Sequence, residues 1–280
     1  MADLVDAGAE LPLTDRDPVR RVSGSIADMG QSYILTKKEL AAMSDKGNEG
    51  RRKMAVQQVL KKTAQLKSNI DARVEWLRWQ ALGNGAMIYD KSGIKLGVDF
   101  GVPEANKVTA ATAWGAATIL ANYERWVQDY IDGNDNGYAP DVFVTGIENI
   151  RIVLNDVAIR KAITGYSDKL LTLDELNTFL RGRELPPMEA FDAKVTYRDP
   201  TNGGKRTTAR LLDSKKGVFL MEGDKIGNVQ MGPTYENNME PGIFARTFTM
   251  ERPLREVVEV VAAGFPKIMY PELIKICTVR

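Results

Sequence analysis

The chain has 280 residues and a mass of 31.0 kDa; 44% of its residues are hydrophobic and 27% are charged, which is ordinary for a globular protein with a sizeable core. It has no histidine and a single cysteine, Cys277, which excludes histidine-based catalytic triads, histidine-ligated or multi-cysteine metal sites and an internal disulfide. The formal net charge of +1 excludes a protein that coats nucleic acid with an overall basic surface.

The N-terminus is acidic and lacks the basic start and apolar run of a secretory signal. No stretch reaches the roughly 18 apolar residues of a membrane span. The longest apolar segment, Val257 to Phe265, is short and is interrupted by Glu259. We therefore expect a cytoplasmic product with a reduced thiol and no membrane partner.

Residues 1–50 contain prolines, glycines and dense charges that predict extended, turning chain. Two pieces resemble strands, Arg20 to Ile26 and Gln31 to Thr36, and together they predict a two-stranded flap. An isolated hairpin is marginal in water, so the flap needs a surface to lie on. If the chain's own body does not supply that surface, another subunit must; a frayed terminus is the alternative.

Residues 51–82 predict a long helix that Gly83-Asn84-Gly85 ends. About 32 helical residues span roughly 48 Å, so this spine helix requires an elongated body. Its first half is basic without an intervening acid, which predicts either a solvated face or a contact with phosphates or a neighbour. The basic residues are Arg51, Arg52, Lys53, Lys61, Lys62 and Lys67. Apolar residues recur at helical spacing at Val56, Val59, Leu60, Leu66, Ile70, Val74, Leu77 and Ala81.

A hairpin is predicted next, from Ala86 to Phe100, with its turn at residues 90–93, where Gly93 can adopt a positive φ. A second helix is predicted over Ala113 to Ile131, and Val142 to Thr145 reads as a short buried strand.

Further helices and then strands complete the pattern. Residues 147–163 predict a helix broken near Asn155-Asp156, and Thr172 and Glu175 form a capping box that opens a helix to Arg181. The strands that follow are predicted at residues 191–197, 218–221, 243–249, 256–261 and 270–279. The order of the elements, a long helix, small strands, helices and then strands, indicates an α+β fold.

No motif nominates a catalytic, cofactor or metal site. The chain has no Gly-rich phosphate loop. Residues 132–137 begin like a calcium loop, but position twelve is Phe143 and not a carboxylate, so an ordinary Asx/Gly loop is expected. Glu256 and Glu259 point to opposite faces of a strand, so they make a poor acid/base pair. We therefore expect no cofactor and no enzymatic activity.

A flap without a surface and a spine too long for a compact globule both indicate one part of an assembly. Over nearly its full length, the chain resembles the tailed-phage major capsid proteins of the lambda-like branch. The residues that carry the resemblance are 15–21 and 31–39, Ala72 to Gly83, the step from Leu96 to Gly101, Trp114, and the proline-bounded stretch from Pro266 to Ile274.

The resemblance implies the Hong Kong 97-type capsid fold. Residues 1–50 would be the N-terminal segment and the extended loop, with the loop itself over about 11–40. Residues 51–110 and 240–264 would form a peripheral domain around the spine helix 51–82. Residues 111–239 and 265–280 would form an axial domain at five-fold and six-fold axes. Family members carry an N-terminal arm before the loop; here the loop-like sequence begins almost at once, so the arm is short or an upstream part is missing.

The resemblance also implies a function: a structural protein that self-assembles into the icosahedral head of a tailed double-stranded DNA phage. Its implied partners are other copies in pentamers and hexamers, portal and scaffolding proteins, a decoration protein, a maturation protease and the enclosed DNA. It would reside in the virion, and in the host cytoplasm during assembly. Expected contacts with neighbouring subunits are Asp15, Arg16, Asp17, Arg20, Arg21, Tyr33, Lys37 and Lys38. The alternatives are an encapsulin-like cargo shell and, third, a hydrolase.

Overall fold

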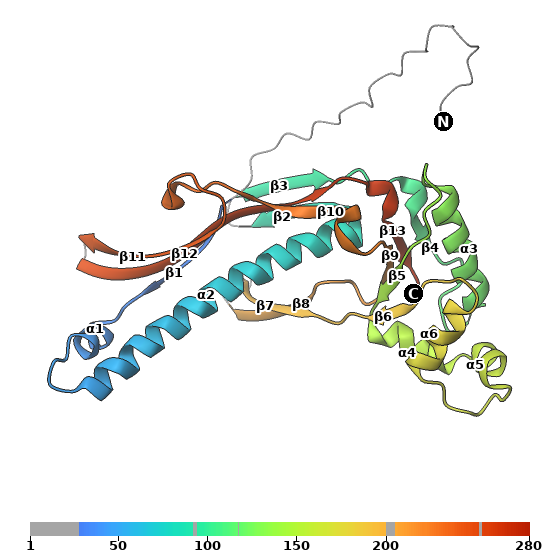
Figure 1. Ribbon diagram of the computed structural model, residues 1–280, viewed down its shortest axis with the longest axis horizontal. Helices are drawn as coiled ribbons and strands as arrows, with labels where there is room; N and C mark the ends of the chain where they lie inside the picture. The colour runs from blue at the N-terminus through green and yellow to red at the C-terminus, as the bar shows by residue number, and fades with distance from the viewer. Residues whose placement is uncertain (1–27, 92–93, 117, 200–204, 252–253) are drawn as a thin grey trace, which may run out of the picture.

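The structure is a computed structural model, and it describes residues 28–91, 94–116, 118–199, 205–251 and 254–280. The described chain has a compact half and an elongated half (Figure 1). Helices cluster around a small sheet in the compact half. In the elongated half, one long helix runs beside a twisted ribbon of strands, so the molecule is much longer than it is thick.

The elongated half is organised around β12 (Leu254–Ile268). Two strands flank it antiparallel, β1 (Asp28–Ile34) and β11 (Ile243–Glu251). Further along β12, β10 (Gly227–Gly232) takes over the pairing, with Gln230 opposite Phe265. Ser32 and Arg246 both pair with Glu259, so at this point β12 lies between β1 and β11.

The long helix α2 (Glu49–Asn84) confirms the predicted spine. Asn48 caps its first turn by accepting a hydrogen bond from the Arg51 backbone N–H at 3.0 Å. Its last turn ends at Gly85, whose φ of 65° is the left-handed conformation that glycine tolerates best. Buried Ile70 packs against Val260 and Ala262 of β12. These contacts attach the middle of the helix to the ribbon.

The compact half is built on a five-stranded sheet in the order β4-β13-β9-β5-β6. The strands are β4 (Lys107–Thr109), β5 (Val142–Thr145), β6 (Met188–Ala190), β9 (Lys216–Leu220) and β13 (Lys275–Thr278). The helices around it are α3 (Ile119–Asp132), α4 (Ile147–Asn155), α5 (Val157–Thr164) and α6 (Leu173–Arg181). Most of the buried apolar side chains of the described residues belong to this half.

Aromatic packing dominates that core. The rings of Phe143 and Phe219 are 4.5 Å apart, and Tyr123 meets Phe143 edge-on at 5.4 Å. Gly217 lies directly against the Phe143 ring, where any Cβ would collide. At the end of α2, Trp79 stacks on Phe191 at 4.0 Å. The spine helix is therefore anchored in the compact core at its C-terminal end.

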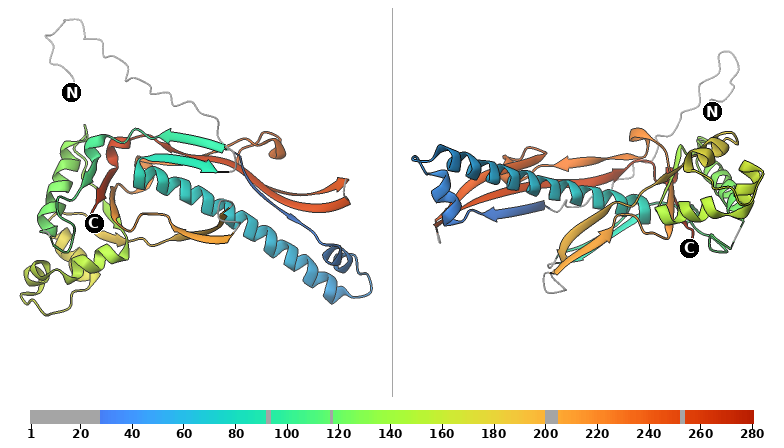
Figure 2. Two further views of the ribbon diagram at one scale, coloured as in Figure 1. Left: turned by 180° about the vertical axis from the view of Figure 1, so that it is seen from behind. Right: turned by 90° about the horizontal axis from the view of Figure 1, so that it is seen from below.

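Smaller elements complete the chain. The hairpins are β2 (Ala86–Lys91) with β3 (Ile94–Asp99), and β7 (Lys194–Asp199) with β8 (Lys205–Arg210), the second of which projects from the body (Figure 2). A short helix, α1 (Lys37–Met43), packs beside α2. Single 3₁₀ turns occur at Glu104–Asn106, Gly223–Lys225, Tyr235–Asn237 and Pro271–Leu273.

The α+β class, the spine helix, the hairpin strands after it, the helix break at Asp156 and the capping box at Thr172 are confirmed. The predicted helix start at Ala113 is wrong: α3 begins at Ile119, because the Trp114 backbone N–H donates to the Val279 carbonyl at 2.8 Å instead of entering a helix. The stretch at 270–279 is a 3₁₀ turn followed by β13, not one strand.

The expectation that the flap has no surface of its own is wrong for the part that the structure describes. Residues 28–34 form β1 on β12, and the Leu35 backbone N–H extends the pairing to the Glu256 carbonyl at 2.8 Å. The other predicted strand, Arg20 to Ile26, and the turn residues Ser92 and Gly93 lie outside the described residues.

Candidate assembly surfaces

The corner where β1 leads into α1 is held by a small polar cluster. Thr36 and Glu39 form a reciprocal capping box, with the Thr36 backbone N–H donating to Glu39 Oε2 at 2.8 Å. The Tyr33 hydroxyl donates to Glu39 Oε1, and Lys62 Nζ lies 4.3 Å from the centre of the Tyr33 ring. Burial, and then the neighbouring Glu39, raise the pKa of Tyr33 to about 12, while the hydrogen bond from Tyr33, followed by those from Thr36, lowers the pKa of Glu39.

Of the expected contact residues, three lie in this corner. The hydroxyl and ring of Tyr33 meet Glu39 and Lys62 of its own chain. Lys37 and Lys38 are exposed in the first turn of α1. Asp15, Arg16, Asp17, Arg20 and Arg21 lie outside the described residues, so the structure brings only three of the eight together.

The N-terminal half of α2 carries an exposed line of residues that we call the basic stripe: Lys53, Val56, Leu60, Ala64 and Lys67. Their spacing of three or four residues places them along one helix face. Leu60 is 63% exposed and Val56 is 37% exposed, so two apolar side chains lie on the surface between two lysines. Within the described chain, neither Lys53 nor Lys67 takes part in an ion pair.

A second surface is the acidic knob, residues 235–240 in the loop between β10 and β11. Tyr235 is 85% exposed and Met239 is 56% exposed, with the carboxylates of Glu236 and Glu240 beside them in the sequence. The loop is closed by its own backbone hydrogen bonds, among them the Met239 N–H donating to the Thr234 carbonyl at 2.9 Å. Asn238 and Met239 both have positive φ, 53° and 63°. This strained, internally bonded shape holds the exposed side chains in place.

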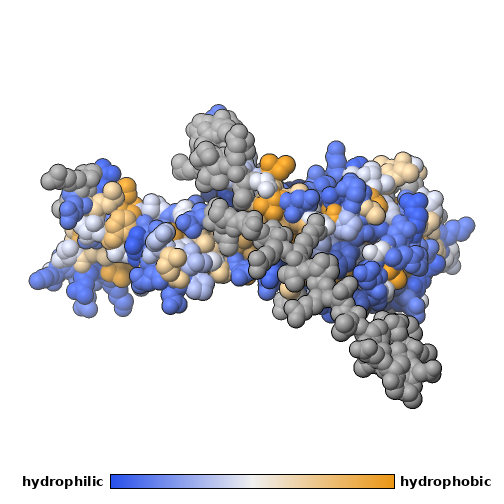
Figure 3. Space-filling model, turned by 90° about the horizontal axis from the view of Figure 1, so that it is seen from above, coloured by the Kyte–Doolittle hydropathy of each residue, from blue (hydrophilic) through white to orange (hydrophobic). Residues whose placement is uncertain are grey.

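The two surfaces lie on opposite sides of the ribbon. In Figure 1 α2 runs along one side, and the loop that joins β10 to β11 rises on the other, the side of β3. Both lie in the half of the molecule away from the five-stranded sheet. The face on the β3 side is mostly hydrophilic with small separate apolar patches (Figure 3).

Two titratable groups of the compact half, Lys275 and Cys277, are buried in β13. Lys275 is buried in β13, with Nζ 3.8 Å from Asp129 Oδ2 of α3, and burial lowers its pKa although Asp129 opposes the shift. Burial raises the pKa of the Cys277 thiol, which is fully enclosed. In the loop at residues 132–137, the Asn134 side chain bonds the backbone of Tyr130 and Tyr138, as expected of an Asx loop.

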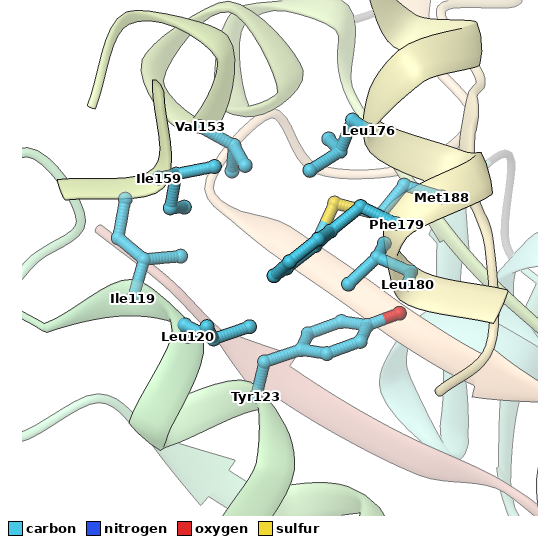
Figure 4. Close-up of a pocket in the computed structure, with 9 residues that line it drawn as sticks. All are labelled: Ile119, Leu120, Tyr123, Val153, Ile159, Leu176, Phe179, Leu180 and Met188. Atoms are coloured by element: carbon cyan, nitrogen blue, oxygen red, sulfur yellow. The ribbon is translucent and has the colours of Figure 1, made fainter. Parts of the chain in front are cut away.

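The enclosed cavity of the compact half is a packing gap. It lies between α3, α4, α5 and α6 and is lined by apolar side chains that point toward one another (Figure 4). Its volume is about 10 Å³, at the lower limit for a single water molecule. The Tyr123 hydroxyl at its margin already donates to the Pro186 carbonyl at 2.8 Å.

An open groove of about 480 Å³ lies between α5 and α6. Its carboxylates, Asp174 and Glu175, belong to the first turn of α6, and hydrogen bonds from Thr172 lower the pKa of Glu175. The capping interpretation of this pair is thus confirmed. In the described residues, no three His, Cys, Asp or Glu side chains are grouped to hold a metal ion, and no helix there is long and apolar enough to cross a membrane.

The sequence of the chain matches the family model described as phage major capsid protein E, over residues 1–263. The chain belongs to this family. It is a structural major capsid protein, and its self-association builds capsid shells of the virion. No curated protein matches its sequence.

Solved structures share the fold of this capsid protein. One is a crystal structure assigned to the capsid protein of a prophage of E. coli CFT073, with 15% identity and a TM-score of 0.61 over 91% of this chain and 77% of that one. Another is a phage-related protein from Bordetella bronchiseptica RB50, with 11% identity and a TM-score of 0.55 over 91% of this chain and 75% of that one.

The basic stripe and the acidic knob were only partly visible in the sequence of this capsid protein. The lysines of α2 are evident in the sequence. Val56 and Leu60 have the same helical spacing as Ile70, which is buried, so the sequence does not show that they are exposed. The knob was missed. The sequence features that indicate an exposed turn here are the pair Asn237-Asn238 and the dipeptide Pro241-Gly242, which lie between two strands. Tyr235 and Met239 are next to them in the sequence.

Proposed function

We propose that this capsid protein forms the icosahedral head of a tailed phage, closing from pentamers and hexamers around double-stranded DNA. The observation that carries the proposal is the family match over residues 1–263. An elongated, thin subunit that exposes apolar side chains along its long helix supports it, because such a shape suits tiling into a shell (Figure 2).

We assign the compact half to the axial domain, residues 111–239 and 265–280, around the symmetry axes. The peripheral domain, residues 51–110 and 240–264, makes up most of the elongated half. Two parts cross these bounds: β4 pairs with β13 in the sheet of the compact half, and residues 235–239 of the knob lie beside the ribbon (Figure 1). Two observations support this division: the large apolar cluster of the compact half and the small one between α2 and β12. β10 belongs to the first segment by sequence and pairs with β12, so it links the two domains.

Residues 1–50 supply contacts to the next subunit in this proposal. Asp15, Arg16, Asp17, Arg20 and Arg21 pair with charges of a neighbour, and Lys37 and Lys38 extend that surface. Tyr33 contributes by fixing the corner from which the loop departs. Each exposed ion pair contributes about 0–1 kcal/mol, and a shell repeats it many times.

The remaining partners follow from the same proposal. A portal, a scaffolding protein, a decoration protein and a maturation protease act on the shell, and assembly takes place in the host cytoplasm. An encapsulin-like cargo shell is the second candidate, and the family match disfavours it. A hydrolase is the third, for which no described cavity or carboxylate pair offers support.

Electron microscopy of the concentrated full chain tests the main proposal. We expect closed shells, and particles isolated from an infected host should contain DNA. Mass spectrometry that finds a packaged enzyme would favour the cargo compartment. A monomer that hydrolyses a substrate and loses this activity on mutation of one carboxylate would favour the hydrolase.

Deletion of residues 11–27 tests the loop. This deletion spares β1, whereas removing residues 11–40 would also strip the strand that covers one side of β12. We expect a folded protein that does not close shells, because the contacts to the neighbour are gone. Deletion of residues 2–10 is the matched control and should leave the shell yield unchanged. Normal yield from the 11–27 deletion would contradict the docking role.

A further inference from the structure

We propose that the acidic knob of one subunit docks on the basic stripe of the next copy in the shell. This inference rests on the proposed function and identifies which surfaces of the subunit meet. It concerns residues 235–240 on one copy, and Lys53, Val56, Leu60, Ala64 and Lys67 on the other.

The chemistry of the two surfaces is complementary. In the knob, each exposed apolar side chain is followed in the sequence by a carboxylate, Tyr235 by Glu236 and Met239 by Glu240. In the stripe, Lys53 and Lys67 flank Val56 and Leu60. Both surfaces therefore combine exposed apolar side chains with adjacent charges, and the charges of the two surfaces are of opposite sign. Tyrosine and methionine are enriched in protein interfaces, where a charged rim surrounds an apolar centre.

The arrangement in space also suits contact between copies. The two surfaces lie on opposite sides of the ribbon and in the same half of the long axis (Figure 1), so one subunit cannot bring them together. A contact between two different patches is heterologous, and repeated rotation closes it into a ring. A two-fold pair would need the knob and the stripe of one copy to face the same partner at once, and their positions on opposite sides of the ribbon (Figure 1) oppose that.

The apolar centre of the stripe favours a protein over DNA as its partner. A helix face that meets the phosphate backbone uses Lys and Arg and gains little from exposed leucine or valine. The knob supplies a preformed match, since its backbone hydrogen bonds fix the loop before contact and reduce the entropy lost on docking.

Charge reversal tests the proposal in the full chain. The knob variant is Glu236→Lys with Glu240→Lys, and the stripe variant is Lys53→Glu with Lys67→Glu. We expect each to lower the shell yield at least tenfold and the four-site combination to restore at least half of it. Thermal unfolding of the unassembled variants should match wild type, since Lys53, Lys67 and Glu240 are exposed and Glu236 is partly so.

Three outcomes would overturn the inference. Both variants could form shells at normal yield, or both could fail without rescue in combination. The stripe variant could also form normal shells that retain less DNA, which would place the stripe against nucleic acid. Wild-type chain that never forms shells would instead overturn the proposed function, and this inference with it.

A cysteine pair gives a second, independent test. Cys277 is the sole cysteine and is buried, so Leu60→Cys with Met239→Cys introduces the only accessible thiols. Oxidation of assembled shells should give a ladder of cross-linked subunits up to the ring size, whereas the monomer should not cross-link. Leu60→Cys with Leu170→Cys is the matched control, because Leu170 is exposed in the compact half, and it should give no ladder. A ladder in the control alone, or in neither, contradicts the proposal.

Discussion

In the compact half, Trp126 and Phe143 are at most 1% exposed, whereas in the first half of α2 Met54 and Leu60 are 67% and 63% exposed. The compact half buries most of its apolar residues in one large cluster, with exceptions such as Leu170, whereas the first half of α2 leaves several apolar side chains on the surface. A shell subunit needs both, because one region must fold alone and the other must gain stability on assembly. The exposed apolar side chains of α2 are therefore available for contacts with neighbouring subunits.

The largest loss of folding stability among these predictions is expected at Phe143, in the core of the compact half. Phe143→Ala removes a ring from the centre of the compact core, and we expect a loss of about 3–5 kcal/mol in the free energy of unfolding. Ile70→Ala removes the central side chain of the smaller cluster beneath α2, and we expect a loss of about 2 kcal/mol. Urea unfolding of the unassembled full chain measures both.

The variants Phe143→Ala and Ile70→Ala can also show that the two halves do not differ. Equal losses at Phe143 and Ile70 would show that the elongated half is as strongly packed within the subunit as the compact half. Leu60→Ser is the surface control for this series, and its effect on the unassembled chain should stay within about 0.5 kcal/mol.

An intermediate effect is expected at the junction of the two halves. Gly85 ends α2 with a φ of 65°, and a Cβ there would lie 3.0 Å from the Cβ of Val102. Gly85→Ala should therefore cost about 1–2 kcal/mol in the free energy of unfolding. Gly97→Ala is the matched control, since a Cβ there would have no neighbour within 4 Å and its effect should be small. Equal unfolding midpoints for the two variants would contradict this account of the helix end.

The smallest effect concerns the corner at Tyr33. The pKa of Glu39 is lowered in the folded chain by its hydrogen bonds from Tyr33 and Thr36, so its stabilising contribution is present above its ordinary pKa of 4.5 and is lost as the pH falls through the folded-state value. Hydrogen-exchange protection of α1 should decrease between about pH 5 and pH 3.

Glu39→Gln provides the control for this pH effect. The amide keeps the size of the side chain and cannot titrate, so protection of α1 should be weaker at pH 7 and independent of pH in this range. Identical pH profiles for wild type and Glu39→Gln would assign the change to another carboxyl group.

Local signals predicted the local structure well. The helix over residues 51–82, the capping box at Thr172 and the break at Asp156 depend on residues a few positions apart, and all were confirmed. The start of α3 was misplaced because Trp114 fits a helical pattern while its backbone N–H bonds the distant Val279. The pairing of β1 with β12 joins residues more than 200 positions apart, which no local pattern encodes.

The candidate surfaces were harder to predict for a related reason. Val56 and Leu60 have the spacing of core residues, and only the position of β12 decides that Ile70 is covered while they are not. The knob depends on positive φ at Asn238 and Met239, a conformation that a methionine rarely adopts. The charged residues at positions 15–21 remain a prediction.

The pairing of β1 with β12 has a consequence for the order of events during translation. Residues 28–34 are synthesised well before the strand that they join, residues 254–268. At about 5–20 residues per second, roughly 10 to 45 seconds pass before that partner is synthesised. The ribbon of a nascent chain therefore stays incomplete until residues 254–268 have been made, and before that moment the chain cannot offer a neighbouring copy the finished surface.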